Sequence, residues 1–565
     1  MRLLLPVILL AFGGCAGAPD RRQAIFSMGQ LGVAQEGAAL PAWEPSARAL
    51  KAALDDPDWR LRQTVIEALG KTGGDGVEEL LTGVLRDPQA PLRGEAALAL
   101  FRLKFLKRMP QYSSAAVAGL SDALSDGDAG VRWKAAYAFS RAPEPRAAER
   151  LRAAAGDKDA LVRLFAIRAL GQFKKEAPEA ALLGALKDMD PQVRREAVAA
   201  LGSAGKAVLL PDAVFSDPAA PVRAAAADAV GASGDASLAG RLSGLLQESS
   251  TLVRGQALLA SAKVMGEAAG PLLHKERTYP HWWIRARAYE ALGSLLPGSQ
   301  AFLQEGVLDG DPRVASTALE ALARSTDTWA DQALLRVLLD TGTALEVVGT
   351  AVDAAKERPK PEFLEALGVA LSNPAVSSSA EVVGSLIEAA AAILKARPEL
   401  SAPWLEPLKA APPRLPFAQA PSSPLPASTV ILETEKGTIV LSLAVAEAPI
   451  HAARFLKSVQ DGFYDGTIWH RVVADFVIQG GDPRGSGWGD AGFLLRDEIN
   501  TLRFDRGALG MPKAGKDTGG CQLFITHVPT PHLDGRYTVF GRVESGMDAV
   551  DRIEPGDKIL RARLR

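Results

Sequence analysis

An apolar residue followed by arginine recurs through the first half of the chain, and this recurrence limits the possible folds most strongly. The pairs are Leu61-Arg62, Leu92-Arg93, Val131-Arg132, Val162-Arg163, Val193-Arg194, Val222-Arg223, Val253-Arg254 and Ile284-Arg285. An acid stands six residues before seven of these arginines: Asp56, Asp87, Asp126, Asp157, Asp188, Asp217 and Glu248. Tyr279 takes that place before Arg285. Most intervals between successive arginines are 31 residues, a period typical of repeat arrays.

Each repeat reads as two helices joined by a polar turn. In one repeat, apolar residues recur at helical spacing within 178–187, and Asp190-Pro191 then supplies an N-cap and a first helical position. A second apolar face follows and ends near Gly202. A helix pair this short cannot bury its apolar face alone, so the pairs must stack into an all-α solenoid over residues 20–410.

Composition excludes several kinds of site. Lys+Arg total 64 against Asp+Glu 66, and this balance gives no electrostatic reason to bind nucleic acid. The only cysteines are Cys15 and Cys521, so a disulfide scaffold and a zinc site built on four thiolates are excluded. The six histidines show no metal-ligand spacing. We therefore expect no metal and no cofactor.

The first residues resemble an export signal. Met1-Arg2 precedes an apolar run over 3–12, which is too short to span a bilayer core, and Gly13-Gly14-Cys15 follows. This pattern resembles the lipobox of bacterial lipoproteins, with residues 1–14 as the signal peptide and Cys15 as the lipidated residue. The alternative is an ordinary signal peptide cut near Ala16-Gly17-Ala18, which would leave a soluble exported protein. We expect a membrane-anchored lipoprotein on the periplasmic face of a bacterial envelope, attached through the lipid alone.

The repeats resemble HEAT repeats, in which an acid and an arginine form a ladder between neighbouring units. Such arrays present surfaces to proteins, so the resemblance implies a protein partner, whose identity stays unknown. Tyr279-Pro280-His281-Trp282-Trp283 replaces a polar turn of the array. These aromatic residues either form a contact site for that partner or pack over an irregular turn.

The sequence pattern changes after residue 410. Residues 411–427 are Pro-rich without a helical or strand period, as in a linker. Short alternating runs then begin at Thr429 and Gly437, with a hairpin turn between them, and 448–460 reads as a helix. We therefore expect a separate β-rich domain over 428–565.

Several motifs in this second domain resemble those of cyclophilins. They are Gly462-Phe463-Tyr464 to His470-Arg471-Val472-Val473, Asp475-Phe476-Val477-Ile478-Gln479-Gly480-Gly481-Asp482-Pro483, Gly507-Ala508-Leu509-Gly510-Met511, Gly519-Gly520-Cys521-Gln522-Leu523-Phe524-Ile525-Thr526 and Leu533-Asp534-Gly535-Arg536-Tyr537-Thr538-Val539-Phe540-Gly541-Arg542-Val543. The run Gly485-Ser486-Gly487-Trp488-Gly489 resembles the glycine-rich loop of the family. The resemblance implies an eight-stranded barrel with capping helices and peptidyl-prolyl cis-trans isomerase activity on proline-containing polypeptides.

The resemblance also assigns the site. The catalytic residues it implies are Arg471 and Gln479. Arg471 matches the family arginine that donates toward the prolyl nitrogen as the amide twists, and Gln479 matches the glutamine that hydrogen-bonds near it and the substrate backbone. The substrate-binding positions implied are Phe476, Val477, Lys513, Gln522, Phe524, His532, Leu533 and Tyr537. Four of the residues here depart from the family: Pro512-Lys513 replaces Ala-Asn, His532 replaces a tryptophan, and Tyr537 replaces a histidine.

Two functions remain open at this point. In the first, the chain is an exported isomerase that assists protein folding and carries a HEAT-like arm for protein binding. In the alternative, it is a non-catalytic, membrane-anchored scaffold whose cyclophilin domain only binds Pro-containing segments.

Overall fold

The computed structural model describes residues 18–34, 50–412, 414–426 and 428–565. The predicted signal segment and Cys15 lie outside the described residues. The chain divides into two compact units: the first holds residues up to Ala229 together with Pro531–Arg536, and the second holds Val230–Thr530 and Tyr537–Arg565. None of the described helices is long and apolar enough to cross a membrane.

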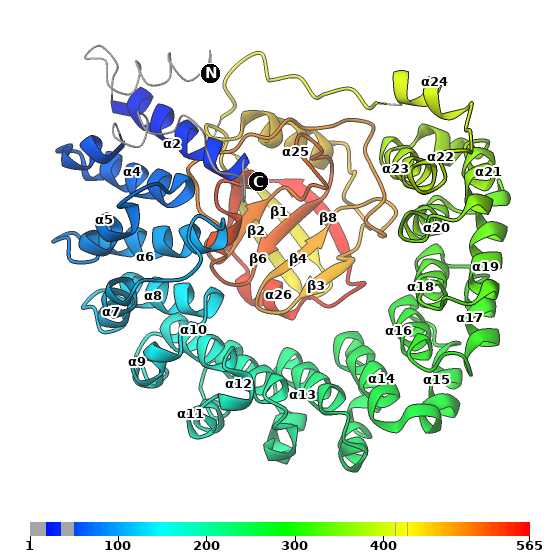
Figure 1. Cartoon of the computed structure of the whole chain (residues 1–565), viewed down its shortest axis with the longest axis horizontal. Coiled ribbons are helices and arrows are strands. Elements are labelled where there is room, and N and C mark those ends of the chain that lie inside the picture. Colours follow the sequence, from blue (N-terminus) through cyan, green and yellow to red (C-terminus); the bar gives the residue numbers. More distant parts are fainter. Residues whose placement is uncertain (1–17, 35–49, 413, 427) are drawn as a thin grey trace. The chain divides into compact units, whose positions relative to one another are not determined.

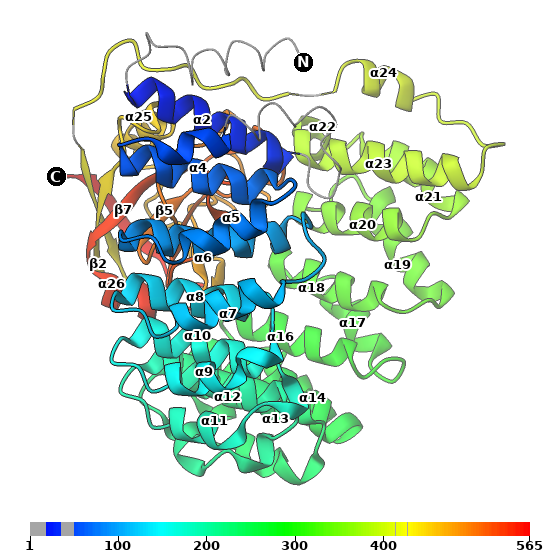
Figure 2. The same cartoon turned by 60° about the vertical axis from the view of Figure 1, so that its left-hand side comes forward.

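The first unit is built from paired helices, which follow one another along the chain in Figures 1 and 2. They are α2 (Ala18–Ala34), α4 (Trp59–Thr72), α5 (Val77–Val84), α6 (Ala90–Phe105), α7 (Ser114–Ala123), α8 (Ala129–Arg141), α9 (Ala148–Ala154), α10 (Ala160–Gly171), α11 (Glu179–Ala185) and α12 (Pro191–Ser203). The boundary between the units falls within α13 (Ala220–Ser233). The second helices of successive repeats stack on one another, α4 on α6, α6 on α8, and so on to α12.

Small residues let these helices approach closely. A Cβ atom added at Gly171 of α10 would lie 2.7 Å from the Cβ of Ala200 in α12, so only glycine fits there. The N-cap prediction is also confirmed, because the Asp190 side chain accepts a hydrogen bond from the Gln192 amide at the start of α12.

The second unit continues the array and adds the β domain. Its array helices are α14 (Thr251–Met265), α15 (Gly270–Glu276), α16 (Trp282–Gly293), α17 (Gln300–Gly306), α18 (Pro312–Ala323), α19 (Thr328–Leu339), α20 (Leu345–Glu357), α21 (Pro361–Ala370), α22 (Pro374–Ser378), α23 (Ala380–Ala396) and α24 (Leu405–Ala410). An apolar cluster over α18–α24 is the core of the last part of the array. The prediction that the repeats form an α-solenoid is confirmed.

The predicted ladder of ion pairs is present and explains the six-residue offset. In the first unit the pairs are Arg21–Asp56, Arg62–Asp87, Arg93–Asp126, Arg132–Asp157, Arg163–Asp188 and Arg194–Asp217; in the second they are Arg254–Glu276 and Arg285–Asp309. Each arginine from Arg93 to Arg194 in that series also donates to the backbone carbonyl six residues before it. At that position the side-chain carboxylate pairs with the arginine of the preceding repeat, whereas the backbone carbonyl accepts a hydrogen bond from the arginine of its own repeat.

Tyr279 can stand where the other repeats have an acid because the carbonyl and the carboxylate at this position bind different arginines. Arg285 donates to the Tyr279 carbonyl at 3.1 Å, and this bond needs no acidic side chain. Arg254, which would otherwise lack its carboxylate, bonds instead to Glu276 at 2.7 Å and lies 4.4 Å above the Tyr279 ring. The two tryptophans that follow are half-buried under arginines, with Arg313 over Trp282 and Arg287 over Trp283, so packing accounts for them.

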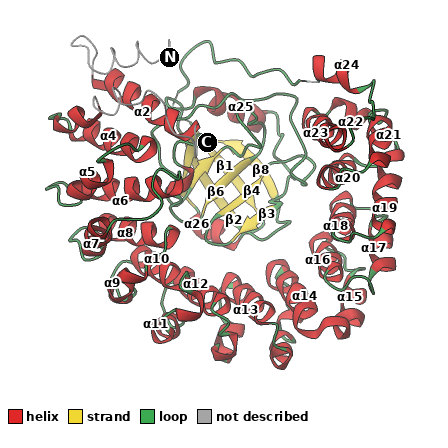
Figure 3. Cartoon of the chain, viewed as in Figure 1, coloured by secondary structure: helices red, strands yellow, loops and turns green. Residues whose placement is uncertain are grey.

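The β domain is an eight-stranded antiparallel sheet that curls on itself, and Figure 3 shows that, within the described part of the chain, strands occur only there. The strands are β1 (Thr429–Thr434), β2 (Gly437–Leu443), β3 (Arg471–Val473), β4 (Val477–Gly480), β5 (Ala508–Gly510), β6 (Leu523–Thr526), β7 (Val539–Ser545) and β8 (Ile559–Leu564), in the order β3-β4-β6-β5-β7-β2-β1-β8. Helix α25 (Pro449–Gln460) packs on β7 and β8, and α26 (Met547–Arg552) packs on β2. The predicted hairpin of β1 with β2 and the helix at 448–460 are confirmed.

The Pro-rich segment after α24 does more than connect the two folds. The Leu494 amide donates to the Pro416 carbonyl, and the Ala418 amide donates to the Leu494 carbonyl, both at 2.9 Å. The Arg496 guanidinium lies 4.7 Å from the Phe417 ring centroid. Proline lacks an N–H group but keeps its carbonyl, so the middle of the segment pairs with the β domain.

Candidate active site

Four groups on neighbouring strands and one loop form a line of hydrogen bonds. The β3–β4 register places Arg471 opposite Gln479, and Arg471 Nη1 lies 3.5 Å from Gln479 Oε1. Gln479 Nε2 donates to Gln522 Oε1 at 2.9 Å, and Gln522 Nε2 donates to the Gly487 carbonyl at 2.8 Å. Arg471 is exposed while both glutamines are half-buried. A chain of hydrogen bonds that begins at the Gly487 backbone carbonyl therefore orients the solvent-facing guanidinium of Arg471.

The loop that supplies this carbonyl is held by Asp482. This aspartate is fully buried, and its carboxylate accepts hydrogen bonds from the backbone amides of Arg484 at 2.8 Å, Ser486 at 2.9 Å and Gly487. Charge-assisted bonds of this kind fix a loop firmly. Asp482 belongs to one of the family motifs, but the sequence predicted no role for it, because its bonds to these amides depend on how the loop folds.

Beside this line lies an apolar wall. Phe524 of β6 is 4% exposed and stacks on Phe504 at 5.4 Å, and the Tyr537 ring meets its edge at 6.2 Å. A Cβ atom at Gly510 would lie 2.3 Å from the Phe524 ring, so this glycine is needed for the ring to fit. Phe504 and Gly510 were not predicted as contributors to the wall.

The remaining predicted residues of the second unit lie around this wall. Val477 is buried in β4, one position from the β3–β4 turn. The Phe476 ring lies 5.9 Å from the Arg471 guanidinium. Lys513 bonds to Asp497 Oδ2 at 2.5 Å and lies 5.5 Å from the Tyr537 ring, so its ammonium is held within the domain.

His532 and Leu533 lie in the Pro531–Arg536 segment, which belongs to the first unit. There the Tyr137 hydroxyl lies 2.9 Å from His532 Nδ1, and the His532 amide donates to the Tyr137 oxygen at 3.3 Å. Arg102 pairs with Asp534 at 3.4 Å. Burial, together with nearby Arg141, Arg168 and Arg536, lowers the pKa of His532 to about 3. Its imidazole is neutral at pH 7, so Nδ1 can accept a hydrogen bond from the Tyr137 hydroxyl.

Two other titratable groups near the site have shifted pKa values. Burial lowers the pKa of His470, next to Arg471, below its usual 6.5, so this ring stays neutral at pH 7. Burial also raises the pKa of the Cys521 thiol to about 12, which makes it a poor nucleophile. Among the described residues, no group of three His, Cys, Asp or Glu side chains is placed to hold a metal ion.

The comparisons with known proteins agree with this arrangement of strands and side chains. Residues 429–563 match the family of cyclophilin type peptidyl-prolyl cis-trans isomerases, and residues 18–101, 151–214 and 209–293 match HEAT repeats. A peptidyl-prolyl cis-trans isomerase of Synechococcus elongatus is 47% identical over 136 residues, which cover 24% of this chain and 94% of that protein. One from Helicobacter pylori is 43% identical over 23% of this chain and 81% of that protein.

A solved structure is also similar. It is a cyclophilin type peptidyl-prolyl cis-trans isomerase of Cryptosporidium parvum, 30% identical, covering 25% of this chain and 98% of its own, with a TM-score of 0.24 over the present chain.

The fold and the matched motifs define the class: a proline isomerase domain of cyclophilin type that follows an array of HEAT repeats. The chain belongs to the cyclophilin family of peptidyl-prolyl cis-trans isomerases, and its C-terminal domain has this activity.

Proposed function

We propose that this chain catalyses cis-trans isomerisation of X-Pro bonds in exported proteins, with Arg471 as the catalytic residue. Rotation about an X-Pro bond crosses a barrier of about 18–20 kcal/mol, because the amide C–N bond is partly double. No covalent bond is made during the turn, so neither a nucleophile nor a metal is required. A donor aimed at the prolyl nitrogen lowers the barrier if it binds the twisted amide more strongly than the planar one.

The observation that carries this proposal is the line of hydrogen bonds ending at Arg471. A guanidinium stays charged and offers a rigid fork of N–H groups, and Gln479 holds one arm of that fork at 3.5 Å. Hydrogen bonds at catalytic sites are often long before substrate binds. Phe524, Val477 and Phe476 then contribute apolar surface for the proline ring, with Tyr537 at its rim.

The export part of the proposal is supported by the N-terminal motif. Arg2, the apolar run and Gly13-Gly14-Cys15 favour a lipid anchor at Cys15, which would hold the enzyme at the periplasmic face of a bacterial envelope. The HEAT array would bind a protein partner there. The substrates would be secreted or envelope proteins whose folding is limited by the isomerisation of an X-Pro bond.

The test uses the full chain and an exported protein whose refolding has a proline-limited phase. Wild type should accelerate that phase, and Arg471→Ala should not. A wild-type chain that binds Pro-containing peptides, yet leaves isomerisation at its uncatalysed time of tens of seconds, would favour the scaffold alternative instead.

A further inference from the structure

The glycine-rich loop of the isomerase domain also contacts the HEAT array within the second unit. Arg484 Nη1 lies 3.3 Å from Glu346 Oε1, and the Ser486 hydroxyl lies 3.5 Å from the same oxygen. Glu346 is in the first turn of α20 and its side chain is only 5% exposed. The loop thus places a cation against a nearly buried carboxylate of the array.

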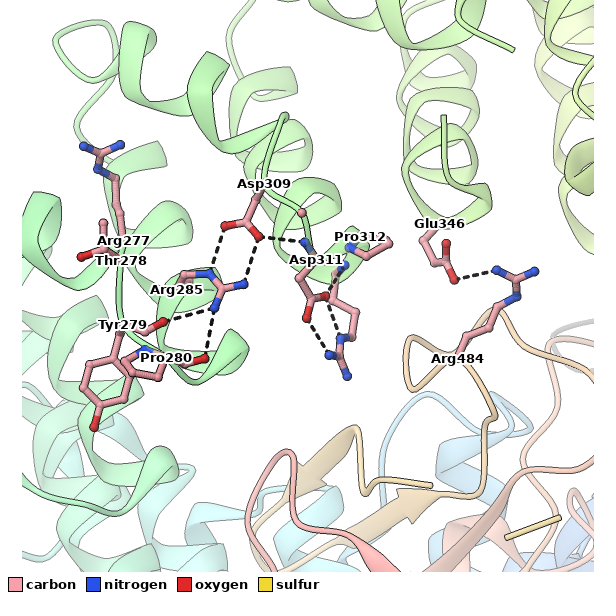
Figure 4. A pocket seen from close by; sticks show the side chains of 12 residues that line it. Arg277, Thr278, Tyr279, Pro280, Arg285, Asp309, Asp311, Pro312, Glu346 and Arg484 are labelled. Carbon is pink, nitrogen blue, oxygen red and sulfur yellow. Dashed lines mark hydrogen bonds and ion pairs between the residues drawn. The ribbon is translucent and has the colours of Figure 1, made fainter. Parts of the chain in front are cut away.

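The other arginines around Glu346 are already paired. A cavity of about 720 Å³ is lined by Arg277, Arg285, Arg313, Arg484 and Glu346, among others. Arg313 is bonded to Asp311. Figure 4 shows Arg285 bonded to Asp309, while Arg484 reaches toward Glu346. Arg277 pairs with Glu305. Because a buried carboxylate is costly without a cation, Arg484 is the partner that keeps Glu346 in place.

A second contact joins the same loop to the same helix. Trp488 packs against the apolar core of the array. Its ring lies so close to Gly349 that a Cβ atom there would be 3.1 Å from it. Gly349 is three residues after Glu346, so both lie on one face of α20. The glycine leaves the space that the indole occupies.

These contacts connect to Arg471 through a continuous series of hydrogen bonds. The loop that α20 holds through Arg484, Ser486 and Trp488 also contains Gly487, whose carbonyl accepts the hydrogen bond from Gln522. Gln522 accepts from Gln479, and Gln479 faces Arg471. We propose that Glu346 and Gly349 of the HEAT array are positioning residues for the isomerase: α20 fixes the loop, and the loop fixes the catalytic guanidinium.

This inference rests on the proposed role of Arg471 and assigns the array a function in catalysis besides partner binding. Its test compares two pairs of matched variants in the full chain. Glu346→Gln removes the buried charge, and its control is Glu388→Gln, whose exposed carboxylate pairs with Lys356. Gly349→Leu fills the space of the indole, and its control is Gly384→Leu, since a Cβ atom at Gly384 meets nothing within 4 Å.

The readouts are kcat and KM in a protease-free proline isomerisation assay, together with hydrogen exchange of residues 484–488. Glu346→Gln and Gly349→Leu should each lower kcat by about threefold to tenfold and speed exchange in the loop. KM should change less than about twofold, because the apolar wall does not depend on the loop. Both controls should behave as wild type. Gly349→Leu could disturb the array itself, so Trp488→Ala removes the same contact from the loop side. It should lower kcat and speed loop exchange in the same way.

Two results would overturn the inference. Faster exchange of the loop with an unchanged kcat would mean that loop position does not matter for catalysis. Unchanged exchange in every variant would mean that α20 does not hold the loop. If the wild-type chain and Arg471→Ala were equally inactive while loop exchange still responded, the proposed catalytic role itself would be refuted, and α20 would hold the loop for another reason.

Discussion

Removing Arg194 should destabilise the array far more than removing an exposed arginine of the same array. Arg194 donates to both carboxylate oxygens of Asp217 at 2.7 and 2.8 Å, and to the Asp188 and Met189 carbonyls at 2.8 and 3.2 Å. The two side chains are 14% and 8% exposed. The bond to Asp217 raises the pKa of Arg194 above its usual value, so the guanidinium stays charged throughout.

The magnitude follows from this exposure. A solvent-exposed ion pair contributes about 0–1 kcal/mol, whereas removing one partner of a buried pair costs about 3–5 kcal/mol. In Arg194→Ala the Asp217 carboxylate keeps the hydrogen bond from the Ala219 amide but loses both bonds from the guanidinium, and two backbone carbonyls lose a donor. We place the loss between these limits, at about 2–3 kcal/mol of unfolding free energy.

The assay is urea unfolding of the full chain, with hydrogen exchange to locate the loss within the repeats. Arg152→Ala is the matched control, because Arg152 and its partner Glu149 are 40% and 83% exposed. It should change stability by less than about 0.5 kcal/mol. Asp217→Asn should cost about as much as Arg194→Ala, and the two changes together should be far from additive. An Arg194→Ala loss no larger than that of Arg152→Ala would refute the ladder as a source of stability.

Three further predictions concern other groups. Cys15→Ser should release the protein from membranes into a soluble exported fraction, and unchanged partitioning in a fractionation experiment would contradict lipid anchoring. The Cys521 thiol, whose pKa burial raises to about 12, should resist a thiol reagent at pH 8 until the chain unfolds, and immediate labelling would contradict its burial. His532 has a folded pKa of about 3 against about 6.5 unfolded, so the unfolded chain binds more protons between these values. Stability should therefore fall as pH decreases from about 6.5, and His532→Gln should flatten that dependence in thermal scans.

The repeat period and the motifs predicted most of the architecture, because both have local causes. Asp190 and Pro191 start a helix wherever they stand before an apolar stripe, and each ladder arginine reaches a carbonyl at a fixed distance along the chain. The acid that replaces the one missing at Tyr279 could not be read from the same register. Glu276 takes its place because the guanidinium of Arg254 in α14 reaches the last residue of α15, three residues before Tyr279.

The candidate site was predicted in its residues but not in its connections. The motifs named Arg471, Gln479 and Gln522, while their order in a line of hydrogen bonds depends on the register of β3, β4 and β6. Asp482 acts by folding a loop, and Glu346 lies in a different fold altogether, so no local pattern linked either of them to the arginine.

The central claim, that Arg471 drives isomerisation, is tested most directly by kcat/KM of the full chain in a protease-free proline isomerisation assay. Arg471→Ala should lower this value by at least about tenfold, equivalent to about 1.4 kcal/mol of transition-state stabilisation, with the barrel still folded because the side chain is exposed. Arg471→Lys should recover little, since an ammonium cannot reproduce the planar fork. An Arg471→Ala chain that isomerises peptides at the wild-type rate would contradict the mechanism.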